Sequence, residues 1–88
     1  MNTSLKVSAP QGTLVTLDQL PCFVPAKVIA IQAEADLAQR MAALGLREQS
    51  VVQVLRHASF GGPVQVRVGT TEIIMRLQDA RQIQLASL

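Results

Sequence analysis

Residues 40–46 read RMAALGL, and they mark one short helix in a chain otherwise rich in Val, Ile and Thr. The helical segment begins near Asp36 and carries three apolar residues spaced i, i+4 and i+7: Leu37, Met41 and Leu44. That spacing places the three side chains on one face of a helix. A helix this short is not stable alone, so we predict that this face packs into the core.

The end of this helix has a specific stop signal. Gly45 can adopt the left-handed backbone conformation that commonly closes a helix. Leu46 follows at the position where a Schellman ending places an apolar contact back onto Met41. At the other end, Asp36 and Gln39 have the spacing of a capping box, which predicts that the helix starts at this point.

Short strand-like segments surround the helix. They have apolar or alternating patterns and span residues 26–31, 50–56, 64–68, 72–76 and 82–85. The helix lies between the first and the second of them. Closely spaced short strands in a chain of 88 residues favour a small, partly open barrel. We therefore predict a mainly β fold of about five strands with one short inserted helix.

The beginning of the chain differs from the rest. Residues 1–12 show little pattern and are predicted to form a flexible tail, although a short edge strand around residues 5–7 is the alternative. Residues 13–88 form the predicted domain. Within it, Leu17 and Leu20 are three positions apart, which suits one helical turn or a wide turn that plugs the domain with two leucines.

The third and fourth strands are predicted to form a hairpin with Thr70 and Thr71 as its central turn residues. This register puts valines of residues 64–68 opposite apolar residues of 72–76 on one face. Because Thr-Thr is a poor turn pair, a longer turn that uses Gly69 is the alternative. The other face carries four outward residues, which we call the outer patch: Gln65, Arg67, Ile74 and Arg76.

Composition argues against several functions. The net charge is only +2 and the chain has neither Trp nor Tyr, so it lacks the basic track and stacking aromatics of a single-strand nucleic-acid binder. No segment reads as a signal peptide or a membrane span, which predicts a cytoplasmic protein without direct membrane insertion. Gly61-Gly62 lacks the residues of a phosphate-binding loop.

Candidate chemistry is sparse. Cys22 and His57 are the single cysteine and the single histidine, 35 positions apart, and a nucleophilic pair would need a third orienting group. Soft metal sites need clustered Cys and His ligands, which the sequence does not show. We predict a non-enzyme with no catalytic residue, no cofactor and no metal site of its own. A weak transition-metal site shared between subunits stays open.

The ordered set of features resembles the FeoA family of bacterial ferrous iron uptake, over about residues 15–86. The resembling stretches are, in order, the two leucines before Pro21, AKVIAI, RMAALGL, SVVQVLR, GGPV, QVRV, IIMR with Asp79-Ala80, and QIQL. The resemblance implies an SH3-like barrel. Two turns depart from the family pattern, because Phe23 and Gln49 stand where a glycine is usual.

The resemblance implies an accessory protein that binds the cytoplasmic part of the FeoB membrane GTPase transporter and modulates iron transport. The outer patch is the first candidate docking surface, because arginine is enriched at interfaces. The far side of the helix, with Gln39, Arg40 and Arg47, is the second. The alternative functions are a metal-responsive regulatory module acting in trans and a homo-oligomerisation module that uses an exposed barrel edge.

Overall fold

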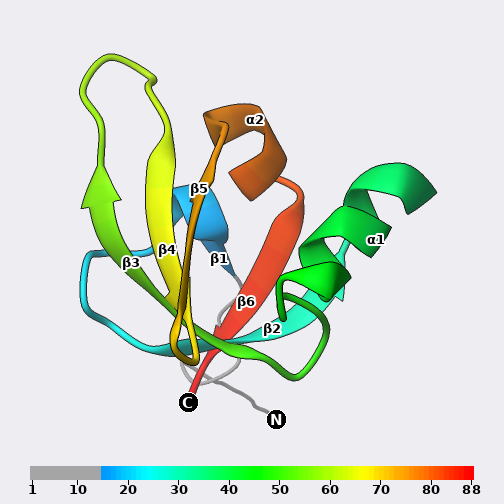
Figure 1. Cartoon of the computed structure of the whole chain (residues 1–88). Coiled ribbons are helices and arrows are strands. Elements are labelled where there is room, and N and C mark those ends of the chain that lie inside the picture. Colours follow the sequence, from blue (N-terminus) through cyan, green and yellow to red (C-terminus); the bar gives the residue numbers. More distant parts are fainter. Residues whose placement is uncertain (1–14) are drawn as a thin grey trace, which may run out of the picture.

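The computed structural model describes residues 15–88 and shows one six-stranded antiparallel sheet in this part of the chain (Figure 1). The strand order across the sheet is β1-β6-β2-β3-β4-β5. The strands are β1 (Val15–Thr16), β2 (Ala26–Ile31), β3 (Val51–His57), β4 (Val64–Val68), β5 (Thr71–Met75) and β6 (Ile83–Ser87). The helices are the 3-10 turn η1 (Leu17–Gln19), α1 (Ala35–Ala43) and α2 (Leu77–Ala80).

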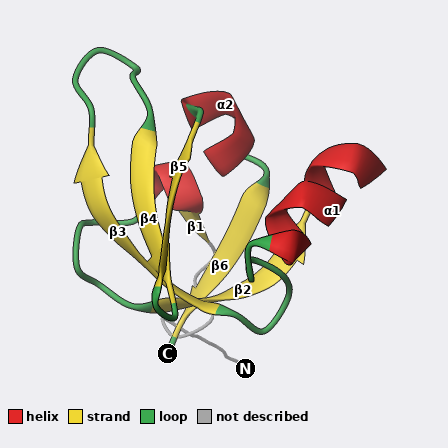
Figure 2. Ribbon diagram, in the orientation of Figure 1, coloured by secondary structure: helices red, strands yellow, loops and turns green. Residues whose placement is uncertain are grey.

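The sheet curls around an aliphatic core and leaves the barrel partly open, as predicted (Figure 2). The largest fully buried side chains are leucines, isoleucine and valines, whereas both phenylalanines are exposed. One-turn helices η1 and α2 lie together beside the sheet, and Arg81 of the α2 end pairs with Asp18 of η1 at 3.6 Å. Leu17 and Leu20 are buried, so the predicted leucine plug is confirmed.

The end of α1 is the Schellman motif predicted from RMAALGL. Gly45 has φ +95°, and its N–H donates to the Ala42 carbonyl at 2.9 Å. The Leu46 N–H donates to the Met41 carbonyl, also at 2.9 Å, and both of these side chains lie in the core. The left-handed glycine therefore reverses the chain and carries Leu46 into the barrel.

Two details predicted for α1 are wrong. The helix starts at Ala35 with Glu34 as its N-cap, and no side chain caps it, so the capping box of Asp36 and Gln39 does not form. Leu44 is 47% exposed rather than packed in the core. Its place at the helix C-cap explains this, because the backbone leaves the helical path at Leu44 and the i+7 spacing no longer fixes its direction.

The β4–β5 hairpin has a register two residues away from the predicted one. Val66 faces Ile73 and Gln65 faces Ile74, with Gly69 and Thr70 at the turn. Gly69 has φ +60°, which a two-residue type II′ turn requires at its first central position. A shift of two preserves which face each side chain occupies, so Ile74 still points outward, 72% exposed.

The count of elements also differs from the prediction. The two-residue strand β1 pairs with β6, so the inserted helix α1 lies between the second and third strands rather than the first and second. Helix α2 was not predicted either. Elements of two and four residues are too short to show a hydrophobic period. The predicted tail, residues 1–12, lies outside the described residues.

Phe23 and Gln49, where the resemblance led us to expect glycine, both have a glycine-like backbone. Their φ angles are +66° and +79°. Each is held by a main-chain hydrogen bond of 2.8 Å, from the Phe23 N–H to the Val54 carbonyl and from the Gln49 N–H to the Val28 carbonyl. Both turns therefore have the backbone conformation that glycine adopts most easily. Because Phe23 and Gln49 carry side chains, this left-handed conformation is strained.

The contrast between Leu46 and Leu44 gives a first prediction. Leu46→Ala should lower the free energy of unfolding by roughly 2–4 kcal/mol, because it empties a fully buried site. Leu44→Ala should cost less than about 1 kcal/mol, because its side chain is half exposed. Urea denaturation of the two variants measures both values. Equal losses would contradict the placement of Leu44 outside the core.

A second prediction concerns Gln49, which is exposed. A side chain in the left-handed region costs about 1–2 kcal/mol, while glycine costs about 0.4–1 kcal/mol through the unfolded state. Gln49→Gly should therefore stabilise the protein by about 0.5–1 kcal/mol in urea denaturation. Gln49→Ala is the matched control, because alanine keeps the Cβ and should bring no gain. A gain from alanine as large as that from glycine would show that the backbone angle is not the cause.

Candidate functional site

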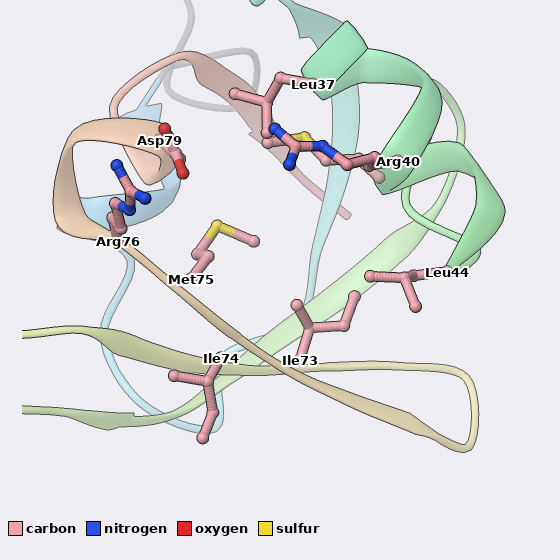
Figure 3. A pocket seen from close by; sticks show the side chains of 9 residues that line it. Leu37, Arg40, Leu44, Ile73, Ile74, Met75, Arg76 and Asp79 are labelled. Carbon is pink, nitrogen blue, oxygen red and sulfur yellow. The ribbon is translucent and has the colours of Figure 1, made fainter.

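A groove with a volume of about 340 Å³ lies between α1 and the edge strand β5 (Figure 3). We call it the α1–β5 groove. Its walls come from α1 with its C-cap, from β5, and from the start of α2. The lining residues are Leu37, Arg40, Met41, Leu44, Ile73, Ile74, Met75, Arg76 and Asp79.

The floor of the α1–β5 groove is apolar. Met41, Ile73 and Met75 are buried members of the core that reach the groove from opposite walls. Figure 3 shows Met75 pointing into the space between the walls, with Ile73 and Leu44 directed toward one another at one end. Because Leu44 sits at the helix end rather than on its buried face, it adds exposed apolar surface to the groove.

The rim of the groove is charged. Arg40 stands on the α1 wall, and Arg76 and Asp79 stand where β5 passes into α2 (Figure 3). Within residues 15–88 the ion pairs are Arg67 with Glu72 and Arg81 with Asp18, so neither groove arginine has a carboxylate partner there. Two arginines against one aspartate leave the rim with a net positive charge.

The outer patch is less basic than the sequence suggested. The Gln65 side-chain amide donates to the Glu72 carboxylate at 3.0 Å, and the Arg67 guanidinium donates to the same carboxylate at 3.1 Å. Sequence reasoning missed Glu72 because the predicted register put Ile74, not Glu72, opposite Arg67. The turn at Gly69 was the signal that could have found it, since it sets the observed pairing of Arg67 with Glu72.

The structure divides the candidate docking residues among three places. Arg40, Ile74 and Arg76 line the α1–β5 groove, although the Ile74 side chain points away from its floor (Figure 3). Gln65 and Arg67 lie with Glu72 on the outer face of the hairpin. Arg47 is exposed in the turn after α1 and lines none of these surfaces.

Sequence reasoning did not connect α1 with β5. The residues that it missed in the groove are Ile73, Met75 and Asp79, which come from β5 and α2. Alternation along 72–76 marks Ile73 and Met75 as inward residues, but nothing in the sequence says that the helix stops short of covering them. The sheet order, which places β5 at an edge, decides this.

The two residues with the most reactive side chains lie away from the groove. Cys22 is exposed, and its residue forms an isolated bridge with Val54. The His57 Nε2 lies 2.9 Å from the Leu20 carbonyl, and since a carbonyl only accepts, this nitrogen donates. Among residues 15–88, no three His, Cys, Asp or Glu side chains gather where they could hold a metal ion.

The helices of the described part are all too short or too polar to cross a membrane.

Comparison with known proteins places the chain in a family. A model of the FeoA domain matches residues 15–87. The FeoA protein of Chlorobium tepidum, solved by NMR, is 30% identical with a TM-score of 0.79, covering 84% of this chain and 70% of that one. No curated protein matches the sequence.

Two further structures are similar. A crystal structure of Stenotrophomonas maltophilia FeoA with zinc, described as a prokaryotic SH3 domain protein, is 28% identical with a TM-score of 0.69. It covers 81% of this chain and 88% of that one. A manganese-dependent transcriptional repressor is 20% identical with a TM-score of 0.78, over 91% of this chain and 44% of that one, which shows a shared fold alone.

The fold is thus the SH3-like barrel that the sequence predicted. Because the domain model spans nearly all the described residues, this chain belongs to the FeoA family.

Proposed function

We propose that this protein is a non-enzymatic accessory protein of bacterial ferrous iron uptake, which binds the cytoplasmic part of a FeoB-type membrane GTPase transporter and modulates transport. The observation that carries the proposal is the FeoA domain match over residues 15–87. The Stenotrophomonas FeoA structure is described as that of a candidate ferrous iron transport activating factor. In this proposal the protein is cytoplasmic and reaches the membrane through its partner.

The surface of the barrel supports a binding role. Leu44 and Ile74 are large apolar side chains with 47% and 72% of their surface exposed, and both border the α1–β5 groove. Exposed apolar groups beside arginines are typical of the centres of protein interfaces. We propose that the transporter docks on this side of the molecule, over β5 and the start of α2, with Ile74, Arg76 and Arg40 among the contact residues.

The outer face of the hairpin is the neighbouring part of the same docking side. Gln65 and Arg67 are already bound to Glu72, so their hydrogen bonds to a partner would compete with existing ones. Ile74 lies directly opposite Gln65 in the ladder, and its apolar side chain has no hydrogen bond to lose. Ile74 is therefore the residue of the outer patch whose substitution tests the docking side most directly.

A third prediction tests this function. Ile74→Asp should weaken binding to the cytoplasmic portion of the FeoB-type transporter at least tenfold, because it places a charge where an apolar contact forms; tenfold corresponds to about 1.4 kcal/mol. Isothermal titration calorimetry of the purified proteins measures the affinity. The fold should be unaffected, since Ile74 lies outside the core, and circular dichroism with urea denaturation checks this.

Val24→Asp is the matched control. Val24 is also an exposed β-branched residue, 45% exposed, and it lies just before β2. It lines neither the α1–β5 groove nor the hollow beside Arg67. Its substitution should leave transporter binding within twofold of the wild type. Absence of any binding by the wild-type protein would overturn the proposed function. Equal effects of Ile74→Asp and Val24→Asp would leave the function standing and reject this docking side.

A further inference from the structure

We propose that the α1–β5 groove receives an extended segment of the partner, with apolar side chains flanked by carboxylates, which adds to the sheet as a strand beside β5. This inference rests on the proposed function and specifies how the docking side is used. Three observations carry it: the state of the β5 edge, the apolar floor beside that edge, and the unneutralised arginines at the rim.

The first observation is an unprotected sheet edge. β5 pairs with β4 on one side and, among the described residues, with no strand on the other. Edge strands are usually protected by shortness, charged side chains, proline or a bulge. β5 has five residues, TEIIM, without lysine or proline, and its ladder with β4 runs from Val64–Met75 to Val68–Thr71 without a register shift. Its one charged side chain, Glu72, is already bound to Gln65 and Arg67 of β4. The opposite edge, β1, has just two residues.

A free edge of this length can hold a short peptide. Five residues span about 17 Å, and main-chain hydrogen bonds along such an edge supply affinity without a fixed sequence. Pairing with a strand also satisfies backbone groups that otherwise face water. The main chain of β5 therefore selects a segment that is extended. It does not by itself select the side chains of that segment.

The second observation is the apolar floor beside the edge. Successive side chains of a strand alternate between faces, so every second residue of an added strand would share a face with Ile73 and Met75. That face looks across the groove toward Leu44 at the C-cap of α1 (Figure 3), and Met41 of α1 also lines the groove. The groove volume of about 340 Å³ accommodates apolar side chains at these positions. Hence alternate residues of the segment are apolar.

The third observation is the charge of the rim. Arg40 and Arg76 stand at two sides of the floor, and within the described residues neither has a carboxylate within 4.0 Å. Carboxylates placed before and after the apolar residues would reach these guanidinium groups, which bind carboxylates in a bidentate geometry. Asp79 beside Arg76 offsets part of this charge, so Arg40 is expected to contribute more.

Charge also argues against a second copy of this chain as the occupant. Pairing of two β5 edges would bring the arginines of one groove close to those of the other. The β5 strand of a second copy would supply a single carboxylate, Glu72, and Arg76 follows that strand. Glu72 already binds Gln65 and Arg67. Like charges at an interface disfavour self-association, so a segment from an acidic partner fits the groove better.

The test uses the full chain, labelled with nitrogen-15, and synthetic peptides observed by NMR. The probe peptide is Ac-Glu-Thr-Val-Thr-Leu-Thr-Glu-NH2, in which alternate residues present Glu, Val, Leu and Glu to one face. The expected result is saturable shifts of the amides of Thr71–Met75 and Ala35–Ala43. A peptide with both Glu replaced by Lys should bind at least fivefold more weakly. Equal affinity of the two peptides, or shifts confined to other strands, overturns the proposal.

Substitutions give the reciprocal test of charge. The double variant Arg40→Glu with Arg76→Glu should lose at least fivefold in affinity for the acidic peptide and gain affinity for the lysine peptide. Arg47→Glu makes, outside the groove, the same change in charge as either of these substitutions alone, and it should stay within twofold of the wild type. A variant that loses affinity for both peptides alike, or a control that behaves like the double variant, would contradict recognition at the rim.

Strand addition itself is tested with two N-methylated peptides. In an added strand, alternate backbone N–H groups face β5, so methylating one alternating set should abolish binding and methylating the other set should not. Equal binding of the two peptides overturns the strand geometry. Sedimentation of the free chain tests the remaining occupant, because a dimer whose dissociation shifts the β5 amides would make a second copy the occupant and defeat the proposal.

Failure of this inference and failure of the proposed function can be told apart. If the transporter portion binds but the peptides fail and the double arginine variant binds the transporter normally, the groove inference fails and the function stands. If the peptides bind the groove with the expected charge preference but the transporter portion does not bind, the proposed function fails. In that case the acidic extended segment that binds the groove belongs to a protein other than the transporter.

Discussion

The limited pairing between β2 and β3 is the constraint on which the rest of the structure depends. The two strands share the pairs Ala26–Val52 and Lys27–Val51, and two main-chain hydrogen bonds at Val28 end the contact. Beyond this point β2 follows β6, while β3 follows β4 and β5. The two halves of the sheet therefore diverge, and the aliphatic core fills the space between them (Figure 1).

The candidate site is a consequence of this divergence. Helix α1 continues from β2, on one half, and β5 is the last strand of the other half. The Schellman turn at Gly45 fixes α1 through Met41 and Leu46, but no aromatic side chain extends this contact to β5. The core has no aromatic residue, and the space between α1 and β5 is an open groove with an apolar floor.

The strained turns show how firmly the fold is determined. Phe23 and Gln49 hold left-handed angles where glycine would be relaxed, because each main-chain N–H completes a hydrogen bond to a strand. Each such angle costs on the order of 1–3 kcal/mol. The sheet imposes these angles against local preference, which explains how the two turns form without glycine.

Local patterns in the sequence determined most of the fold: β2 and β4 match residue for residue, and the helix end has the left-handed Gly45 and the buried Leu46 that were predicted. These features depend on neighbouring residues, through alternation or through the backbone freedom of Gly45. The hairpin register was also open to local reasoning, because it followed from the angle at Gly69, which brought Glu72 to Arg67. The tertiary structure alone decided the groove. Predicting the groove required knowing that β5 ends the sheet beside α1, and no local pattern encodes the order of strands.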